Sequence, residues 1–190
     1  TRWAGALPDP EHTRVVIAGG GVVSAVVMAP RVLCFGPSRI PAMTIGPVGT
    51  HDKHRKCGYA AAAMNDASRY MAENGVLVAY LNGLPDFYHR FGYYPFMAYS
   101  AVKLKRKQVE REAAPGRLRV MTRKDLPAVI RIHKAATAGR LCSSERDADL
   151  WAWLLAHGKS GSLFSNPKVI VGESGRVHGY VTLKQRGGLY

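Results

Sequence analysis

The sequence predicts an α/β (α+β) fold with a mixed sheet. A strand-loop-helix-strand unit lies at the centre of this sheet. Residues 44–75 contain an apolar strand, a basic turn and an alanine-rich helix. The buried-strand pattern at 76–81 follows, and a strand-helix-strand unit of this length implies a parallel crossover. Before it, the β-rich runs 13–18 and 22–31 flank Gly19-Gly20-Gly21 and predict an antiparallel hairpin.

Length and composition limit the class of protein. With 190 residues and 47% apolar residues, the chain could form one large domain or two small ones. No apolar run approaches the roughly 18–20 residues of a membrane-spanning helix, and the N-terminus lacks a signal-peptide pattern. We therefore expect no membrane partner and a cytoplasmic location. Because the chain lacks an initiator Met, we expect a processed protein or a fragment.

The cysteines argue against two kinds of structural site, and the charge is distributed unevenly along the chain. Cys34, Cys57 and Cys142 are odd in number and widely spaced, which argues against a disulfide framework and against a cysteine-based zinc site. The formal net charge is +14, and residues 101–190 hold 18 of the 27 Lys and Arg residues. A basic half of this kind is typical of nucleic-acid binding, of anionic ligands, of an acidic partner surface or of a solvated surface.

The first half continues the pattern in order. Residues 40–48 predict a third strand, and Pro47 within it predicts a bulge or a splayed strand end. Residues 58–74 predict the clearest helix, because Met64, Ala67 and Met71 form one apolar stripe. After the strand at 76–81, residues 86–91 predict a short helix and residues 93–104 a further strand or strand pair.

The second half restarts the pattern after a charged segment. We expect a domain at 1–104, a linker at 105–116 and a second domain at 117–190. The expected elements of the second domain are a strand at 118–121, a helix after Thr122 with Asp125 as part of its cap, a helix at 147–157, and a hairpin of strands at 169–173 and 177–183.

The turn at 50–60 has the features of an anion site. A strand before it and a helix after it would aim the free N–H groups and the positive end of the helix dipole at a ligand in the turn. Arg55 and Lys56 add positive charge, and Gly58 allows close approach of the backbone. The turn lacks the GxxxxGK(S/T) and GxGxxG patterns, so we expect a pyrophosphate-type ligand that is held in another way.

In this context the turn resembles the acetyl-CoA-binding motif of the GNAT acetyltransferase superfamily, Q/R-x-x-G-x-G/A, through Arg55, Gly58 and Ala60. The block from Asp86 to Pro95, with the residues DFYHRFGYYP, is similar to the F-Y-x-R-F-G-F/Y block of the same family. Many members have proline three residues before the motif arginine, where this chain has Asp52. An acid near a pyrophosphate disfavours tight cofactor binding.

The resemblance also implies an unusual order of elements. A GNAT domain usually begins with a strand and two helices before its first hairpin, and residues 1–12 are too short to supply them. Residues 117–184 are similar to that front half. Two tandem GNAT-like units, the second one partial, resemble the enhanced-intracellular-survival-type acetyltransferases, with this chain cut at both ends. The alternative is a permutation in which the second half supplies the missing elements of the first.

The resemblance implies an N-acetyltransferase that moves an acetyl group from acetyl-CoA directly to an amine. Backbone amides around the splayed strand end would polarise the carbonyl, and amides of the turn would hold the pyrophosphate. Asn82 would contact the pantetheine or form a turn. The expected cofactor-binding residues are Val48, Gly49, Thr50, Arg55, Lys56, Cys57, Gly58, Tyr59, Ala60 and Asn82. No metal is expected.

Tyr88 matches the family's general acid, because a tyrosine stays protonated at neutral pH and can donate to the leaving thiolate. The alternative role for Tyr88 is aromatic core packing. The predicted strand at 40–48 contains no Asp or Glu that could act as a base. His51, His54 and His89 are near in sequence, but each is expected to be a surface or structural residue, and a water relay is equally open.

Two other functions compete with acetyl transfer. One is a GNAT-like module that lacks catalysis and binds CoA or a partner. The other is a basic nucleic-acid binder, which the sparse aromatic residues of 103–140 disfavour. The acceptor would be a small-molecule or peptide amine, and aminoglycosides, polyamines, protein lysines and small amines all remain open. A homo-oligomer is also open.

Overall fold

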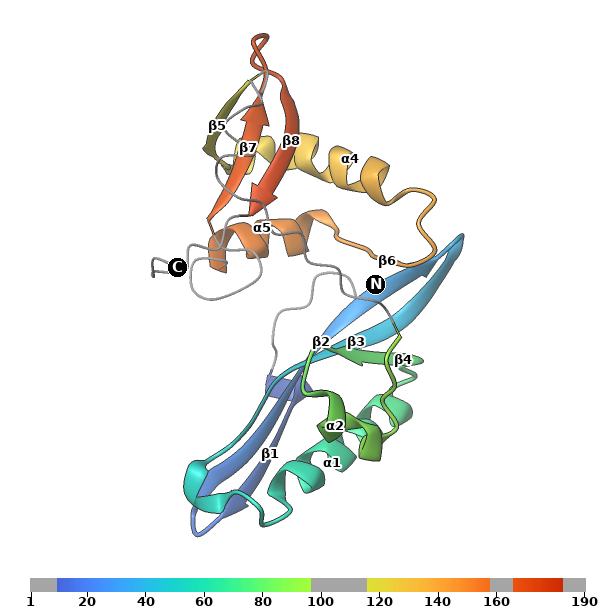
Figure 1. Ribbon diagram of the computed structural model, residues 1–190, viewed down its shortest axis with the longest axis vertical. Helices are drawn as coiled ribbons and strands as arrows, with labels where there is room; N and C mark the ends of the chain where they lie inside the picture. The colour runs from blue at the N-terminus through green and yellow to red at the C-terminus, as the bar shows by residue number, and fades with distance from the viewer. Residues whose placement is uncertain (1–9, 97–115, 158–165, 183–190) are drawn as a thin grey trace. The chain divides into compact units, whose positions relative to one another are not determined.

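The computed structural model describes residues 10–96, 116–157 and 166–182, which form two compact units (Figure 1). The first unit takes its described residues from Thr1–Tyr94 and Gly139–Arg146, and the second takes them from Pro95–Ala138 and Asp147–Tyr190. The sequence assigns 117–190 to a single second domain, whereas Gly139–Arg146 belongs to the first unit. The reason is a long-range strand pairing that leaves no local pattern.

The first unit is a five-stranded mixed sheet with the order β1-β2-β3-β4 and with β6 paired to β2. Its elements are η1 Pro10–His12, β1 Thr13–Ala18, β2 Gly21–Phe35, β3 Ser38–Thr50, η2 Asp52–His54, α1 Tyr59–Glu73, β4 Val78–Leu81, α2 Pro85–Tyr88, η3 His89–Phe91 and β6 Ser143–Ser144. Strand β2 is antiparallel to β1, β3 and β6, and β4 is parallel to β3. The predicted mixed sheet is therefore confirmed.

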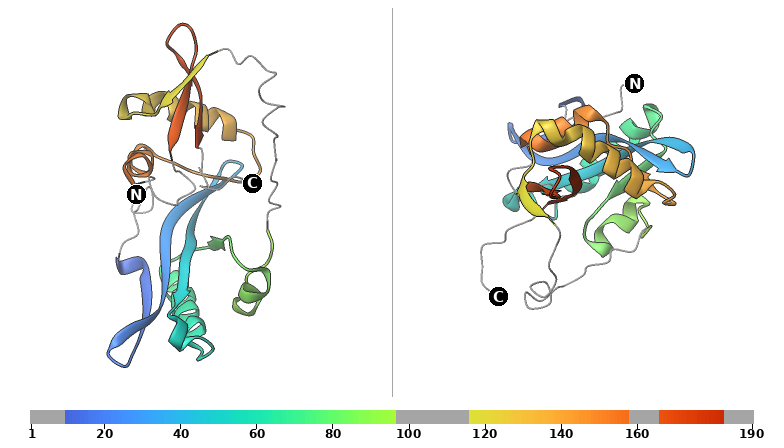
Figure 2. Two further views of the ribbon diagram at one scale, coloured as in Figure 1. Left: turned by 60° about the vertical axis from the view of Figure 1, so that its left-hand side comes forward. Right: turned by 90° about the horizontal axis from the view of Figure 1, so that it is seen from above.

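Helix α1 covers one face of this sheet (Figure 2). The stripe of Met64, Ala67 and Met71 predicted from the sequence is buried against Val26 and Met28 of β2, so it forms the core as expected. Alanines in the first turns give the helix a high intrinsic propensity. Gly75, with a φ of +71°, ends the helix in the left-handed conformation that favours glycine.

In its described residues, the second unit is a three-stranded antiparallel sheet of order β5-β7-β8 with the α-helices α4 and α5. Its elements are β5 Arg117–Val120, η4 Arg123–Asp125, α4 Leu126–Thr137, α5 Ala148–His157, β7 Pro167–Val171 and β8 Val177–Thr182. Trp151 of α5 is fully buried among Val129, Val169 and Val171. The strand-helix-helix-hairpin order predicted for this half is thus observed.

The predicted strand at 93–104 has a different outcome. Residues 93–96 are described and do not form a strand, whereas 97–104 lie outside the described residues. Nearly all of the predicted linker at 105–116 also lies outside them. Pro95, which cannot donate a ladder hydrogen bond, is consistent with the irregular backbone at 93–96.

Candidate cofactor-binding and active site

Strand β3 carries a bulge near its end. Val26 pairs with Val48 and Met28 with Ile45, so Gly46 and Pro47 together lie opposite the single residue between Val26 and Met28 on β2. Gly46 has a φ of +149°, and the Gly46–Pro47 peptide bond is cis. An extra residue in one strand bends that strand and re-aims its backbone groups. The bulge predicted from Pro47 is therefore present.

The same point marks the end of the pairing between β3 and β4. The parallel ladder runs from Ala42 paired with Val78 to Ile45 paired with Leu81, and it goes no further. From Val48 to Thr50, all the strand pairing that the structure describes for β3 is with β2. The parallel pairing therefore ends at Ile45 and Leu81, the last residue of β4, and the splayed strand end stays a prediction.

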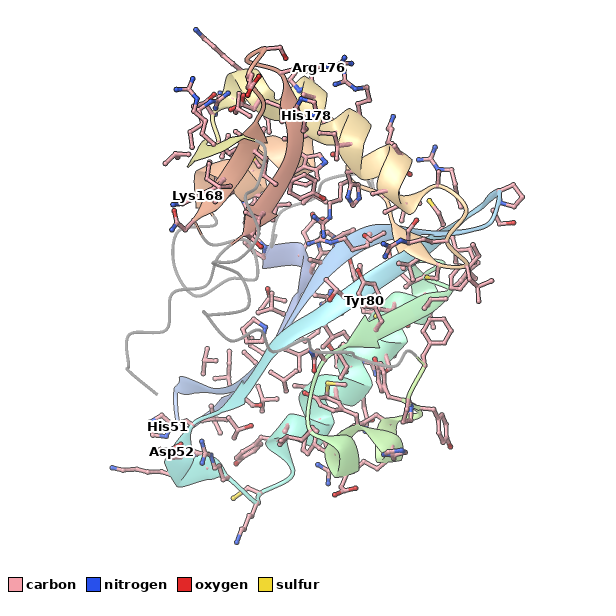
Figure 3. The ribbon with its side chains drawn as sticks, turned by 45° about the horizontal axis from the view of Figure 1, so that its top comes forward. His51, Asp52, Tyr80, Lys168, Arg176 and His178 are labelled. Atoms are coloured by element: carbon pink, nitrogen blue, oxygen red, sulfur yellow. The ribbon has the colours of Figure 1, made fainter. Side chains whose placement is uncertain are left out.

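A short, well-anchored turn connects β3 to α1. The His51 N–H donates to the Val23 carbonyl at 2.9 Å, and the His54 N–H donates to the His51 carbonyl at 2.8 Å. His51 Nδ1 accepts from the Lys53 N–H at 3.3 Å. The turn therefore has a defined backbone, although His51 and Lys53 are exposed and His54 is half-buried. Figure 3 shows His51 and Asp52 at this end of the sheet.

The start of α1 is open. Gly58 is its N-cap residue and has a φ of +81°, and no side-chain hydrogen bond caps the helix in the part of the chain that the structure describes. The first intrahelical bond runs from the Ala62 N–H to the Gly58 carbonyl at 3.0 Å. The amides of Tyr59, Ala60 and Ala61 therefore have no partner within the helix, as in any first turn. A Cβ on Gly58 would meet no atom within 4 Å.

Charged side chains flank this open helix start. Arg55, Lys56 and Cys57 are exposed, and Lys56 has a φ of +63° in the left-handed region. Arg55 Nη2 lies 2.7 Å from Asp52 Oδ1, so the acid at the family's proline position pairs with the motif arginine. The Cys57 thiol donates to the Arg55 carbonyl at 3.4 Å. Arg55, Lys56, Cys57 and Gly58 are thus exposed where the chain enters α1, and their binding of pyrophosphate stays a prediction.

Tyr88 ends α2, on the segment that follows β4. Its ring meets the Phe87 ring edge-on with centroids 4.9 Å apart, and it lies against the backbone of Gly83, where an added Cβ would approach Tyr88 Cε2 to 2.2 Å. The ring also packs against the core of the first unit, and the residue is half-buried. Packing therefore fixes the ring of Tyr88.

Tyr93 supports Tyr88 from the other side. The two ring centroids lie 6.1 Å apart, and the Tyr93 N–H donates to the Tyr88 carbonyl at 3.3 Å. Burial raises the pKa of Tyr93 to about 12, and a hydrogen bond with Ser68 opposes that rise. Tyr93 is thus a half-buried neutral phenol that packs against Tyr88.

The remaining candidates lie at the surface. Asn82 is exposed between β4 and α2, and His89 is exposed, consistent with the surface role expected for it. The described residues contain no group of three or more His, Cys, Asp or Glu that could hold a metal ion. Among the helices described, none combines the length and apolar character needed to cross a membrane.

Sequence reasoning missed a further group of residues in the first unit. Tyr80 and Arg31 lie on the sheet face opposite α1, with Ser144 and Arg146 from the segment Gly139–Arg146. The pairing of β6 with β2 brings the segment of Ser144 and Arg146 to a sheet that already holds Arg31 on β2 and Tyr80 on β4. A hairpin or helix pattern could not have revealed that pairing, because its two strands are about 110 positions apart.

The comparisons with known proteins agree with this geometry. A family model described as acetyltransferase (GNAT) domain matches residues 1–96, which is just over half of the chain. No curated protein matches the sequence. A conserved protein of unknown function from Enterococcus faecalis V583, a probable N-acyltransferase, is similar in structure with a TM-score of 0.62 and 19% identity, over 94% of this chain and 46% of that one.

A second solved structure is also similar over most of this chain. The GCN5-related N-acetyltransferase from Kribbella flavida has a TM-score of 0.57 and 16% identity, over 90% of this chain and 46% of its own. The chain therefore spans less than half the length of both proteins. At these identities the likeness shows the fold, and the tandem arrangement stays a prediction.

Proposed function

This chain belongs to the acetyltransferase (GNAT) family, and we propose that its first unit transfers an acetyl group from acetyl-CoA to an amine. The observations that carry the proposal are the end of the β3–β4 pairing at Ile45 and Leu81 and the uncapped start of α1, which follows β3 in the chain. A strand edge that loses its partner exposes backbone groups to a ligand, and an uncapped helix start attracts an anion. Acetyl-CoA carries a pyrophosphate, which suits the helix start, and a thioester arm, which suits the exposed backbone groups of the strand.

The proposal assigns each part of acetyl-CoA to a segment. The pyrophosphate lies on the amides of residues 58–61, with Arg55 and Lys56 beside it. The pantetheine follows the edge of β3 that β4 leaves, near Asn82. The thioester carbonyl accepts hydrogen bonds from backbone N–H groups among Val48, Gly49 and Thr50. These fixed donors stabilise the negative charge that develops on the carbonyl oxygen.

The chemistry requires one bond to form and one to break. The lone pair of a neutral amine attacks the carbonyl carbon, and the carbon–sulfur bond breaks as the tetrahedral intermediate collapses. Tyr88 gives its phenolic proton to the leaving thiolate. The amine loses its own proton to water, since Ser38–Thr50 contains no carboxylate, and water returns a proton to Tyr88.

The test combines binding and turnover measurements. Acetyl-CoA affinity is measured by calorimetry, and CoA release is measured against a panel of amines. Tyr88→Phe keeps the ring packing but removes the proton donor, so we expect turnover to fall about 100-fold with unchanged acetyl-CoA affinity. Tyr94→Phe is the matched control, because Tyr94 is 75% exposed in the same aromatic block. Unchanged turnover in Tyr88→Phe would remove this residue from the mechanism.

One observation favours a second candidate, a GNAT-like module that binds CoA without catalysis. The ion pair of Arg55 with Asp52 occupies the motif arginine with the chain's own acid. The two candidates differ in one measurement. A module without catalysis binds CoA and releases none from acetyl-CoA with any amine, whereas the enzyme releases CoA with at least one.

A further inference from the structure

A pair of hydroxyl groups joins β2 to the end of β3. Ser24 of β2 pairs directly with Thr50, the last residue of β3, and the two hydroxyl oxygens are 2.9 Å apart. Ser24 is only 2% exposed, and every other residue from Val22 to Val27 is apolar. A buried hydroxyl is costly unless it is hydrogen-bonded, so a serine in this run depends on the partners that it finds here.

The hydrogen bonds of this pair run in one direction. A serine hydroxyl has a single proton, and the Ser24 hydroxyl donates it to the Gly49 carbonyl at 3.0 Å. The bond between the two hydroxyl groups therefore takes its proton from Thr50, and Ser24 Oγ accepts it. Ser24 thus binds both the side chain of Thr50 and the carbonyl of the peptide group that precedes it.

The strand pairing determines where the Thr50 N–H points. Antiparallel pairs alternate between those that exchange two backbone hydrogen bonds and those that exchange none. The His51 N–H donates to the Val23 carbonyl at 2.9 Å. This bond flanks the Ser24–Thr50 pair, which is therefore of the second kind. The Thr50 N–H points away from β2, toward the edge of β3 that pairs with β4 only as far as Ile45.

Ser24 restrains this N–H through the peptide group to which it belongs. The Gly49 carbonyl and the Thr50 N–H lie in one planar peptide unit, so a bond that holds the carbonyl also sets the direction of the N–H. Thr50 is the last strand residue before the turn, and strand ends open more readily than strand centres. The two hydrogen bonds of Ser24 therefore hold the backbone at the point where β3 stops.

We propose that Ser24 is a positioning residue for acetyl transfer, which holds the Thr50 N–H in the direction in which it donates to the thioester carbonyl. This inference rests on the proposed function, which places that carbonyl near the amides of Val48, Gly49 and Thr50. By the same alternation, the Gly49 N–H points toward β2, so the Thr50 N–H is the better placed of these two donors. A donor that is fixed before the reaction stabilises the developing oxyanion without reorganisation.

Infrared spectroscopy of the whole chain with acetyl-CoA, isotope-labelled at the carbonyl carbon, tests the inference without an acceptor amine. A fixed N–H donor polarises the carbonyl, so we expect its stretching frequency to be lower in the bound than in the free thioester. Ser24→Ala should return most of this shift toward the free value at unchanged acetyl-CoA affinity. Ser24→Thr keeps the hydroxyl and should keep the shift.

Turnover gives a second measurement. With any amine that supports CoA release, Ser24→Ala should lower kcat about tenfold and change the KM for acetyl-CoA by less than about twofold, because the donor acts mainly on the charge of the transition state. Thr44→Val is the matched control, since it removes a hydroxyl from the same strand, at a position whose neighbours Met43 and Ile45 belong to the α1 core. The carbonyl frequency should be unchanged in this control.

The outcomes separate the inference from the proposed function. If acetyl-CoA binds and Ser24→Ala leaves the carbonyl frequency unchanged, the inference is overturned and the acetyl transfer stands, even where the variant is less stable. A bound frequency equal to the free one in the unchanged protein overturns it as well. If acetyl-CoA does not bind, the proposed function itself fails. Should Ser24→Ala not fold, Ser24→Cys keeps the shape of the side chain with a weaker donor, and it should lose part of the shift.

Discussion

The two units begin their first long helices in opposite ways. In the first unit, α1 starts at Gly58 with no side-chain cap in the described residues. In the second unit, the helical segment after Thr122 starts with a capping box, in which Asp125 Oδ2 accepts from the Thr122 N–H at 2.8 Å and from the Thr122 hydroxyl at 2.9 Å. One helix start is open, and the other is closed by a capping box whose carboxylate binds the N-cap residue Thr122.

The negative charge of the capping residue Asp125 is also neutralised. Arg119 donates to both carboxylate oxygens of Asp125 at 2.7 Å, and Asp125 itself is only 5% exposed. These bonds from Arg119 hold the pKa of Asp125 well below its usual range, and the hydrogen bonds from Thr122 add to the effect. The second helix of this unit is also capped, because the Leu150 N–H donates to Asp147 Oδ1 at 2.8 Å.

The difference shows that a helix start can serve either ligand binding or the stability of the fold. A capping carboxylate at a helix start stabilises the helix through the same dipole that attracts a ligand phosphate. A helix start closed in this way gains stability and is less able to bind an anion. The second unit closes its start with Asp125, whereas the first leaves the start of α1 open beside Arg55 and Lys56. We therefore expect that closing the start of α1 weakens ligand binding. Opening the start after Thr122 should instead lower stability.

The largest effect is expected from closing the start of α1. Ala61 is the third residue of the helix, where a glutamate reaches back to the N-cap amide as in a capping box. We expect Ala61→Glu to weaken acetyl-CoA binding about 100-fold, because its carboxylate competes with the pyrophosphate and repels it. Calorimetry at fixed ionic strength measures the change.

The control for this variant adds the same charge one residue later. Ala62 is exposed, and its N–H already donates to the Gly58 carbonyl. Ala62→Glu should therefore weaken binding by less than about tenfold. An equal loss in both variants would mean that general charge repulsion, and not occupation of the helix start, weakens the binding.

A smaller effect is expected at Gly58 itself. Gly58→Ala places a side chain at a φ of +81°, which costs about 1–2 kcal/mol. We expect acetyl-CoA to bind about tenfold more weakly, because relief of this strain turns the first amides away from the ligand. Gly75→Ala creates similar strain at the other end of α1, where φ is +71°, and should lower stability without changing acetyl-CoA affinity. Equal affinity in Gly58→Ala and the unchanged protein would contradict the proposed seat.

Opening the filled start should affect stability alone. Asp125→Ala removes the cap, so we expect the free energy of unfolding to fall by about 1–2 kcal/mol without any gain of acetyl-CoA binding. Urea unfolding monitored by tryptophan fluorescence measures the change, since the buried Trp151 reports on the same unit. A variant that gained acetyl-CoA affinity would show that any open helix start suffices.

The same carboxylate predicts a dependence on pH. The pKa of Asp125 is lower in the folded chain than in the unfolded chain, where it lies near about 3.9. The stability that it contributes is therefore present above about pH 5 and is lost as pH falls toward the folded-state pKa. Asp125→Asn should remove this part of the acid dependence and converge with the unchanged protein at low pH. Parallel curves at all pH values would contradict the assignment.

Local patterns in the sequence predicted much of this contrast. The Met64, Ala67 and Met71 stripe fixed the buried face of α1, and Thr122 with Asp125 predicted the cap that the structure confirms. Pro47 predicted the bulge. Each of these signals lies within a few residues of the feature that it predicts, because helix periodicity, capping and strand interruption are local properties.

The long-range features could not be predicted in the same way. The pairing of β6 with β2 brings Ser144 beside Leu33, and neither residue has a distinctive neighbour pattern. The contact of Tyr88 with Gly83 depends on how the segment after β4 folds back. The pairing of Asp52 with Arg55 needs side-chain conformations, although the acid was visible as a departure from the family motif.

That ion pair gives the smallest expected effect and the finest test of the open helix start. Asp52 and Arg55 are both well exposed, and exposed pairs contribute little to stability. Asp52→Ala releases Arg55 toward the pyrophosphate and removes a negative charge, so acetyl-CoA affinity should rise about two- to fivefold with no measurable change in unfolding. Calorimetry over a range of salt concentrations checks it, because the gain should shrink as screening increases. Weaker binding in Asp52→Ala would instead mean that Asp52 orders the turn. A carboxylate would then organise a helix start in both units.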